Sequence, residues 1–162
     1  MHRINIASPE FKYDSGDPQG FRSGMFRFGP NLGASQLGAT VYELPPGQAL
    51  CPYHYEHAEE EWLLVLEGRP SVRHPEGTEQ LEPWDAVCFT TGPEGAHGVR
   101  NETDETVRVL MFSTIKHPAV TVYPDSDKVG VWTRDRRDNL MTTRSSAVDY
   151  WFGETGPPRG SK

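Results

Sequence analysis

Glycine and proline interrupt the sequence along almost its whole length. The chain has 16 glycines and 14 prolines among 162 residues, and they stand between apolar runs instead of gathering in one tract. Proline inside a helix removes a hydrogen bond and clashes with the preceding turn, so this distribution disfavours helices of ordinary length. Short strands joined by turns are therefore expected throughout the chain.

Six strand-like runs follow one another in the middle of the chain, and each ends at turn-forming residues. The runs are Gly38–Leu44, Glu61–Leu66, Ser71–His74, Ala86–Thr90, His97–Asn101 and Val107–Ser113. Short strands with turn signals at regular spacing are typical of an antiparallel sandwich or barrel. The sequence thus predicts an all-β fold.

The length of the chain corresponds to one domain. We expect a single domain over residues 1–162, with an arm at 1–36, a barrel core at 37–115 and a tail at 116–162. Both alternating faces of Glu61–Leu66 are apolar apart from Glu61, so both should be covered. The barrel interior covers one face, and the arm, the tail or a second subunit covers the other. Because an apolar sheet face of this kind is usually buried against a second subunit, we predict a homodimer.

Charge and hydropathy exclude several classes of partner. A net charge of −7 disfavours binding to nucleic acid or to anionic membranes, because both require a clustered basic surface. No segment approaches the roughly 20 apolar residues of a membrane-spanning helix, and the first residues lack a signal pattern, so we expect a cytoplasmic protein.

The chain has two cysteines. Cys51 and Cys88 are interpreted as small buried residues, with a disulfide as the alternative.

Four side chains with nitrogen or oxygen donors form a candidate metal site. His54, Glu56 and Glu61 lie within eight residues, and His97 follows two strands later. Residues two apart on a strand share a face, so His54 and Glu56 should point together while His57 points away. Imidazoles and carboxylates are ligands for divalent metal ions. The alternative is that these are ordinary polar residues at a barrel mouth.

The spacing of these residues resembles the two motifs of the cupin superfamily. The first motif, Gly-x5-His-x-His-x3/4-Glu-x6-Gly, is similar to the run of Gly47, His54, Glu56, Glu61 and Gly68. The second, Gly-x5-Pro-x-Gly-x2-His-x3-Asn, is similar to that of Trp84, Asp85, Thr90, Gly92, His97 and Asn101. The likeness covers about Leu37 to Ser113 and is nearest to the small single-domain cupins of the cupin-2 type. It implies a double-stranded β-helix barrel, with the arm and the tail packed on the outside.

The departures from the motifs change the implied ligand set. Glu56 stands where the family usually has its second histidine, so the resemblance implies a metal held by His54, Glu56, Glu61 and His97. Two alternatives stay open: Glu56 is a hydrogen-bonded carboxylate beside the ligands, or a local bulge turns His57 inward in its place. A divalent ion is expected, with iron or manganese favoured by the carboxylates and zinc or nickel as alternatives.

The resemblance also implies a function. A metal-binding cupin enzyme acting on a small oxygenated organic substrate, most often with dioxygenase-like chemistry, is the first hypothesis. A metal-dependent lyase or isomerase comes next, and a non-catalytic module that binds or senses a small molecule is the alternative of another class.

Glu59 and Glu60 are expected in a solvated turn, with a role as general base as the alternative. Arg100 would offset part of the negative charge if it reaches the site.

Overall fold

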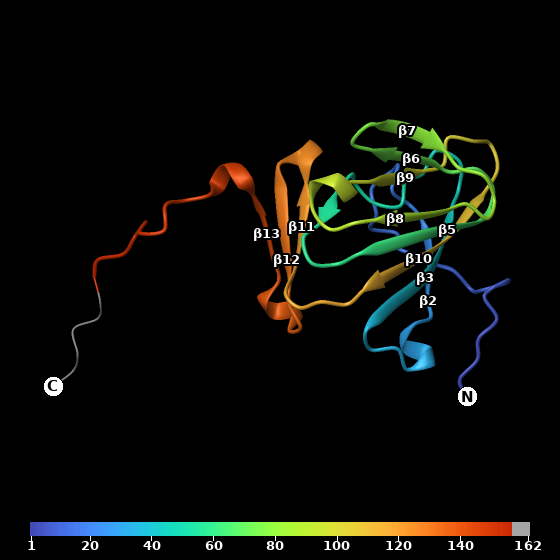
Figure 1. The fold of residues 1–162 in the computed structure, drawn as a ribbon, viewed down its shortest axis with the longest axis horizontal. Coiled ribbons are helices and arrows are strands. Elements are labelled where there is room, and N and C mark those ends of the chain that lie inside the picture. The colour runs from blue at the N-terminus through green and yellow to red at the C-terminus, as the bar shows by residue number, and fades with distance from the viewer. Residues whose placement is uncertain (157–162) are drawn as a thin grey trace.

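The computed structural model describes residues 1–156, and its strands form three antiparallel sheets (Figure 1). The predicted all-β fold is confirmed. The helical elements of these residues are single 3-10 turns, three of which begin at a proline, a residue whose fixed φ suits the start of a helix. These turns are η1 (Pro30–Leu32), η2 (Pro93–Gly95), η3 (Pro124–Ser126), η4 (Arg136–Asp138) and η5 (Arg144–Ser146). The described residues contain no helix long and apolar enough to cross a membrane.

The largest sheet has six strands in the order β1-β2-β3-β10-β5-β8. They are β1 (Lys12–Tyr13), β2 (Gly24–Arg27), β3 (Leu37–Leu44), β10 (Val107–Thr114), β5 (Glu61–Glu67) and β8 (Ala86–Phe89). Strand β10 lies between β3 and β5 and pairs with both, so the sheet brings together segments that are far apart in the sequence. Strand β2 belongs to the predicted arm and extends the sheet along the edge of β3.

Two smaller sheets complete the fold. The three-stranded sheet contains β6 (Ser71–His74), β7 (Gly77–Gln80) and β9 (Gly98–Arg100). The four-stranded sheet contains β4 (Tyr55–Glu56), β11 (Ala119–Tyr123), β12 (Lys128–Trp132) and β13 (Leu140–Thr143). The six predicted runs agree with β3, β5, β6, β8, β9 and β10 to within a residue or two at each end, whereas the strands of the arm and the tail were not predicted.

The barrel core lies on the inner face of the largest sheet. The alternation of β5 shows how it is built, because Leu63 and Val65 are buried in the core while Trp62 and Leu64 face outward. Glu61 shares the inner face with Leu63 and Val65 at the first position of the strand. The pattern that builds the core therefore also carries one carboxylate into the barrel.

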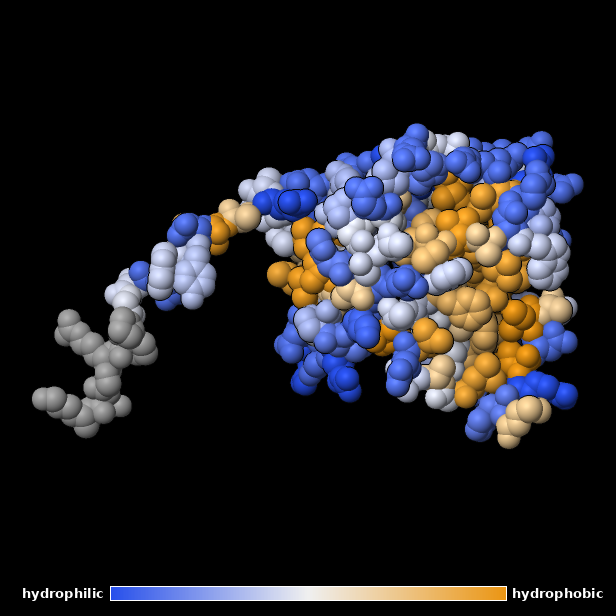
Figure 2. Space-filling model, in the orientation of Figure 1, coloured by the Kyte–Doolittle hydropathy of each residue, from blue (hydrophilic) through white to orange (hydrophobic). Residues whose placement is uncertain are grey.

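The outer face of the largest sheet is covered only in part. Ile4, Ile6 and Phe11 of the arm pack on the cluster that contains Val41 and Leu110, as expected for an arm on the outside of the barrel. Trp62 and Phe112, which are paired across β5 and β10, remain 46% and 36% exposed. Figure 2 shows hydrophobic side chains gathered on this face. The uncovered part is where the predicted second subunit would bind.

The tail first forms three strands of the four-stranded sheet and then extends away from the barrel. Strand β11 pairs with β4, so the first part of the tail packs beside the barrel. The chain beyond η5 runs away from the body of the molecule (Figure 1). Tyr150, Trp151 and Phe152 of the tail are exposed and do not cover the barrel. Residues 157–162 of the predicted tail lie outside the described residues.

Candidate metal centre

Two histidines from distant parts of the chain are paired through their backbones. His54 and His97 form an isolated antiparallel bridge, in which each backbone amide donates to the carbonyl of the other at 3.0 and 2.8 Å. Residues that are directly opposed in this way project from the same face. Their ring centroids are accordingly 4.6 Å apart, and both side chains are buried.

Glu61 reaches the two histidines from β5. Its Oε2 atom lies 3.4 Å from Nε2 of His54 and 3.4 Å from Nε2 of His97. Glu61 is opposite Phe89 in the register of β5 and β8, and the Phe89 ring stacks on His97 with centroids 3.6 Å apart. These contacts hold the three donor side chains, which we call the His–Glu–His group, in one place.

Backbone carbonyls orient both imidazole rings. Nδ1 of His54 lies 3.0 Å from the carbonyl oxygen of Pro52, and Nδ1 of His97 lies 3.0 Å from that of Gly95. A carbonyl oxygen only accepts hydrogen bonds, so each Nδ1 carries the proton. In the neutral ring this leaves the lone pair on Nε2, which is the nitrogen that faces Glu61. Histidine ligands of metal ions are commonly oriented in this way.

The protonation of the group is coupled. Burial raises the pKa of Glu61, but the adjacent imidazoles of His54 and His97 outweigh it and hold this pKa below the usual range. Burial lowers the pKa of His54, but contacts with Cys51 and Glu61 raise it by more than burial lowers it. The pKa of His54 is therefore higher than usual. Burial and the charge of His54 lower the pKa of His97 to about 4. The directions of these shifts favour an ion pair between a protonated His54 ring and the Glu61 carboxylate, while His97 stays neutral.

The donor atoms of the group fit a divalent cation. One donor atom from each residue lies within 4.8 Å of the others. Oε2 of Glu61 is buried and accepts no hydrogen bond of good geometry, despite its closeness to both rings. A buried carboxylate oxygen without a hydrogen-bond partner is costly, and a cation at this point would satisfy it. His54, Glu61 and His97 can thus hold a metal ion.

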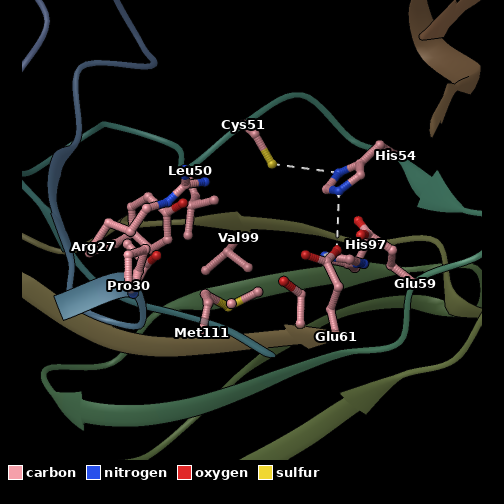
Figure 3. Close-up of a pocket in the computed structure, with 14 residues that line it drawn as sticks. Arg27, Pro30, Leu50, Cys51, His54, Glu59, Glu61, His97, Val99 and Met111 are labelled. Carbon is pink, nitrogen blue, oxygen red and sulfur yellow. Dashed lines mark hydrogen bonds and ion pairs between the residues drawn. The ribbon is translucent and has the colours of Figure 1, made fainter. Parts of the chain in front are cut away.

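A cavity of about 360 Å³ opens beside the His–Glu–His group. Its middle is apolar, and its polar lining comes from β2, β3, β10 and the segment before β5 (Figure 3). The apolar residues are Pro30, Leu50, Val99 and Met111, and the remaining residues besides the group itself are Arg27, Gly38, Thr40, Tyr42, Cys51, Glu59 and Ser113. A small organic molecule fits a volume of this size.

Glu56 does not belong to the group that the structure brings together. Its Oε1 atom accepts a hydrogen bond of 2.6 Å from Thr121 Oγ1, and Thr121 in turn accepts one from Trp132 Nε1. Its other oxygen, Oε2, is buried without a hydrogen-bond partner. Burial raises the pKa of Glu56 to about 7, although the bond from Thr121 opposes the rise. A role for Glu56 as a fourth ligand remains a prediction.

The neighbouring candidates lie in different places. His57 is exposed, and its ring forms a T-shaped pair with that of Tyr55. Glu59 lines the cavity and accepts a hydrogen bond from the backbone amide of Lys116, whereas Glu60 is exposed and accepts one from Trp62. Of the two carboxylates in the predicted turn, only Glu59 is placed for chemistry in the cavity.

The two cysteines do not pair with each other. Both thiols are free and partly buried. Cys51 lines the cavity, and its Sγ lies 3.5 Å from Nδ1 of His54, whereas Cys88 lies on β8.

The basic residue of the cavity was missed by the sequence analysis. Arg27 and Arg100 are both exposed, but Arg100 lines a different depression, whereas Arg27 lines the cavity of the His–Glu–His group. The sequence contains a weak signal for this position. Phe26 and Phe28 both belong to the outer apolar cluster, which on a strand leaves Arg27 on the opposite face.

Comparison with known proteins supports the fold. Residues 40–113 match the family model of the cupin domain Cupin_2. Comparison with curated proteins gives no significant match. A sugar phosphate isomerase of the cupin superfamily from Silicibacter pomeroyi is 23% identical over 90% of this chain and 94% of its own, with a TM-score of 0.78.

Two further solved structures are similar at comparable identity. A protein from Acidithiobacillus ferrooxidans, provisionally named for sugar phosphate isomerase activity, is 22% identical over 80% of this chain and 81% of its own, with a TM-score of 0.74. A polyketide cyclase from Streptomyces resistomycificus is 23% identical over 72% of this chain and 80% of its own, with a TM-score of 0.58. The family match over residues 40–113 and the fold shared with these structures show that the chain contains a cupin domain.

Proposed function

We propose that the protein is a metal-dependent enzyme that acts on a small oxygenated organic substrate in this cavity. The observation that carries the proposal is the convergence of His54, Glu61 and His97 on one buried point beside the cavity. Three protein donors leave positions of a bound metal free for a substrate. When bound, a divalent ion supplies Lewis acidity that polarises a carbonyl or carboxylate oxygen.

Dioxygenase-like chemistry is the first reaction class within this proposal. Two histidines and one carboxylate with open positions form the ligand set of many non-haem iron oxygenases. This set favours iron, with manganese next and zinc or nickel as alternatives. Within the cavity, Leu50, Val99 and Met111 provide an apolar surface that limits the entry of water around the reacting atoms.

A metal-dependent isomerase or lyase is the second candidate. Glu59 brings a half-buried carboxylate to the same cavity, and burial raises its pKa, although the bond from Lys116 opposes the rise. A carboxylate with a raised pKa is better suited to accept a proton from carbon next to a polarised carbonyl. The names of the similar proteins from Silicibacter and Acidithiobacillus also point to isomerisation.

Metal analysis and oxygen dependence test these candidates. Elemental analysis of untagged protein should find close to one divalent ion per chain, and His97→Ala should lose it. Oxygen uptake with a panel of small hydroxy acids, keto acids and phenolic compounds should require ferrous iron if the protein is a dioxygenase. Turnover in the absence of oxygen would instead support the isomerase or lyase. A protein without bound metal, whose melting temperature does not respond to added metal, would be a non-catalytic binding or sensing module.

The partners expected from the sequence belong to this proposal as well. A small molecule is the proposed ligand, and a homodimer formed through the uncovered outer face of the largest sheet is the proposed assembly. A cytoplasmic location remains a prediction.

A further inference from the structure

Arg27 stands on the cavity side of the strand that the arm adds to the barrel. In the register of β2 and β3 it is opposite Thr40, and directly opposed residues share a sheet face. Thr40 and Tyr42 line the cavity on that face. Burial raises the pKa of Tyr42, and the charge of Arg27 opposes the rise, which is consistent with a guanidinium close to the Tyr42 hydroxyl.

The guanidinium of Arg27 has no acidic partner within residues 1–156. Four arginines of these residues are paired with carboxylates; among them, Arg73 donates to both oxygens of Asp125 and Arg108 donates to Glu43. Over the same range, Arg27 has no such pair, and neither do surface arginines such as Arg100 and Arg134, but only Arg27 also lines the cavity. Acidic residues outnumber basic ones by 23 to 16, so carboxylates are not scarce. Among the residues that the structure describes, Arg27 is also the only lysine or arginine that lines the cavity. Its five N–H donors are therefore free for a ligand.

The cavity has two chemically different ends. In Figure 3, Arg27 lies at one side and the His–Glu–His group at the other, with Val99 and Met111 between them. A molecule that spans the cavity meets a positive charge, then an apolar stretch, then the metal ligands. The hydroxyl groups of Thr40, Tyr42 and Ser113 add hydrogen-bonding groups to the lining.

We propose that Arg27 binds an anionic group of the substrate, a carboxylate or a phosphate monoester, while a carbonyl or hydroxyl group at its other end lies at the metal ligands. The planar guanidinium matches both anions, because each accepts two parallel hydrogen bonds from it. This inference rests on the proposed function, since it assigns the substrate of the same site to the class of small organic anions. The cavity therefore selects against neutral molecules of the same shape.

Matched pairs of probes test this site in the manganese-loaded protein. Levulinate carries a ketone and a carboxylate, and its methyl ester lacks the charge. Dihydroxyacetone phosphate and dihydroxyacetone form the corresponding phosphate pair. Binding of each probe is measured by isothermal titration calorimetry to wild type, Arg27→Gln and Arg27→Lys. Arg134→Gln is the matched control, because Arg134 is exposed in the tail, does not line the cavity and gives the same change in net charge.

We expect wild type to bind at least one anion about tenfold or more tightly than its neutral partner, which is the size of about one charge-assisted hydrogen bond. Arg27→Gln should abolish this preference, Arg27→Lys should retain part of it, and Arg134→Gln should leave it unchanged. A preference for levulinate alone identifies a carboxylate site, and one for dihydroxyacetone phosphate alone identifies a phosphate site. No preference in wild type, or a preference that survives in Arg27→Gln, would overturn the inference.

Titration with Mn²⁺ alone separates this inference from the proposed function. Arg27 is not among the proposed ligands, so Arg27→Gln should bind Mn²⁺ with the dissociation constant of wild type. If wild type binds none of Mn²⁺, Fe²⁺, Zn²⁺ and Ni²⁺, the proposed function fails, and the same probe pairs are then measured on the metal-free protein. A preference for anions that Arg27→Gln removes there still supports an anion site at Arg27, and the lack of one overturns it.

Discussion

Removing the charge of Glu61 tests the metal centre without changing its shape. Glu61→Gln keeps the size of the side chain whose Oε2 lies 3.4 Å from both imidazole Nε2 atoms. An amide oxygen is neutral and a much weaker ligand for a divalent cation than a carboxylate. We therefore expect this variant to lose most of the stabilisation that metal binding gives to the wild-type protein.

The size of the loss follows from linkage between binding and folding. At a metal concentration 100 times the dissociation constant, a metal that binds only the folded state stabilises it by about 2.7 kcal/mol. For a chain of this length that corresponds to a rise in melting temperature of roughly 5–10 °C. If affinity falls about 100-fold, as substitutions around metal sites can cause, the same metal concentration contributes only about 0.4 kcal/mol. The expected shift in the variant is then roughly 1–2 °C.

Calorimetric melting of untagged protein measures these shifts. Each protein is melted after metal removal and again with Mn²⁺, Zn²⁺, Ni²⁺ or, without oxygen, Fe²⁺. The metal-dependent increment is the measured quantity, so any change in the metal-free stability of the variant cancels. Glu105→Gln is the control, because it removes the same charge from an exposed position outside the cavity. An increment in Glu61→Gln equal to that of wild type would refute the assignment of Glu61 as a ligand.

Three further predictions concern the barrel, the second carboxylate and the assembly. Asn101 is fully buried, and its amide donates to the carbonyls of Leu44 and Glu105. Asn101→Ala should therefore lower the free energy of unfolding by about 3 kcal/mol. A loss below about 1 kcal/mol in urea titrations would contradict this. Glu56→Gln should weaken metal binding at least tenfold if Glu56 is a ligand or supports one, and calorimetric affinity equal to wild type would leave the His–Glu–His group as the complete set. Sedimentation equilibrium should give about twice 18.2 kDa at micromolar concentration, and Trp62→Lys should shift the mass toward the monomer, whereas a wild-type mass near 18 kDa would exclude the homodimer.

The central strands were predictable because their signals are local. In β5, apolar residues on both faces follow Glu61, and Gly68 ends the run, so neither its existence nor its limits depend on distant residues. The opposite holds for β2, which has four residues. Its partner β3 decides that it is a strand, and the irregular sequence of the arm contains no sustained period that would show this.

The metal site was predictable as a set of candidates rather than as a geometry. Motif spacing selected His54, Glu61 and His97, which the structure brings together. It also selected Glu56 through the two-residue period of a strand, but β4 pairs with β11 and Glu56 bonds to Thr121 there. The tail that supplies this partner is more than 60 residues away in the chain, so no local pattern could reveal it.

By itself, the sequence determined the all-β class, the central strands and the histidines and carboxylates available to a metal. These follow from turn residues, alternation and spacing, which act between near neighbours in the chain. Only the tertiary structure decided that Glu61 is the carboxylate between the histidines and that Arg27 faces the same cavity. Those two facts depend on register between strands far apart in sequence, and register is set by the hydrogen bonds and packing of the folded barrel as a whole.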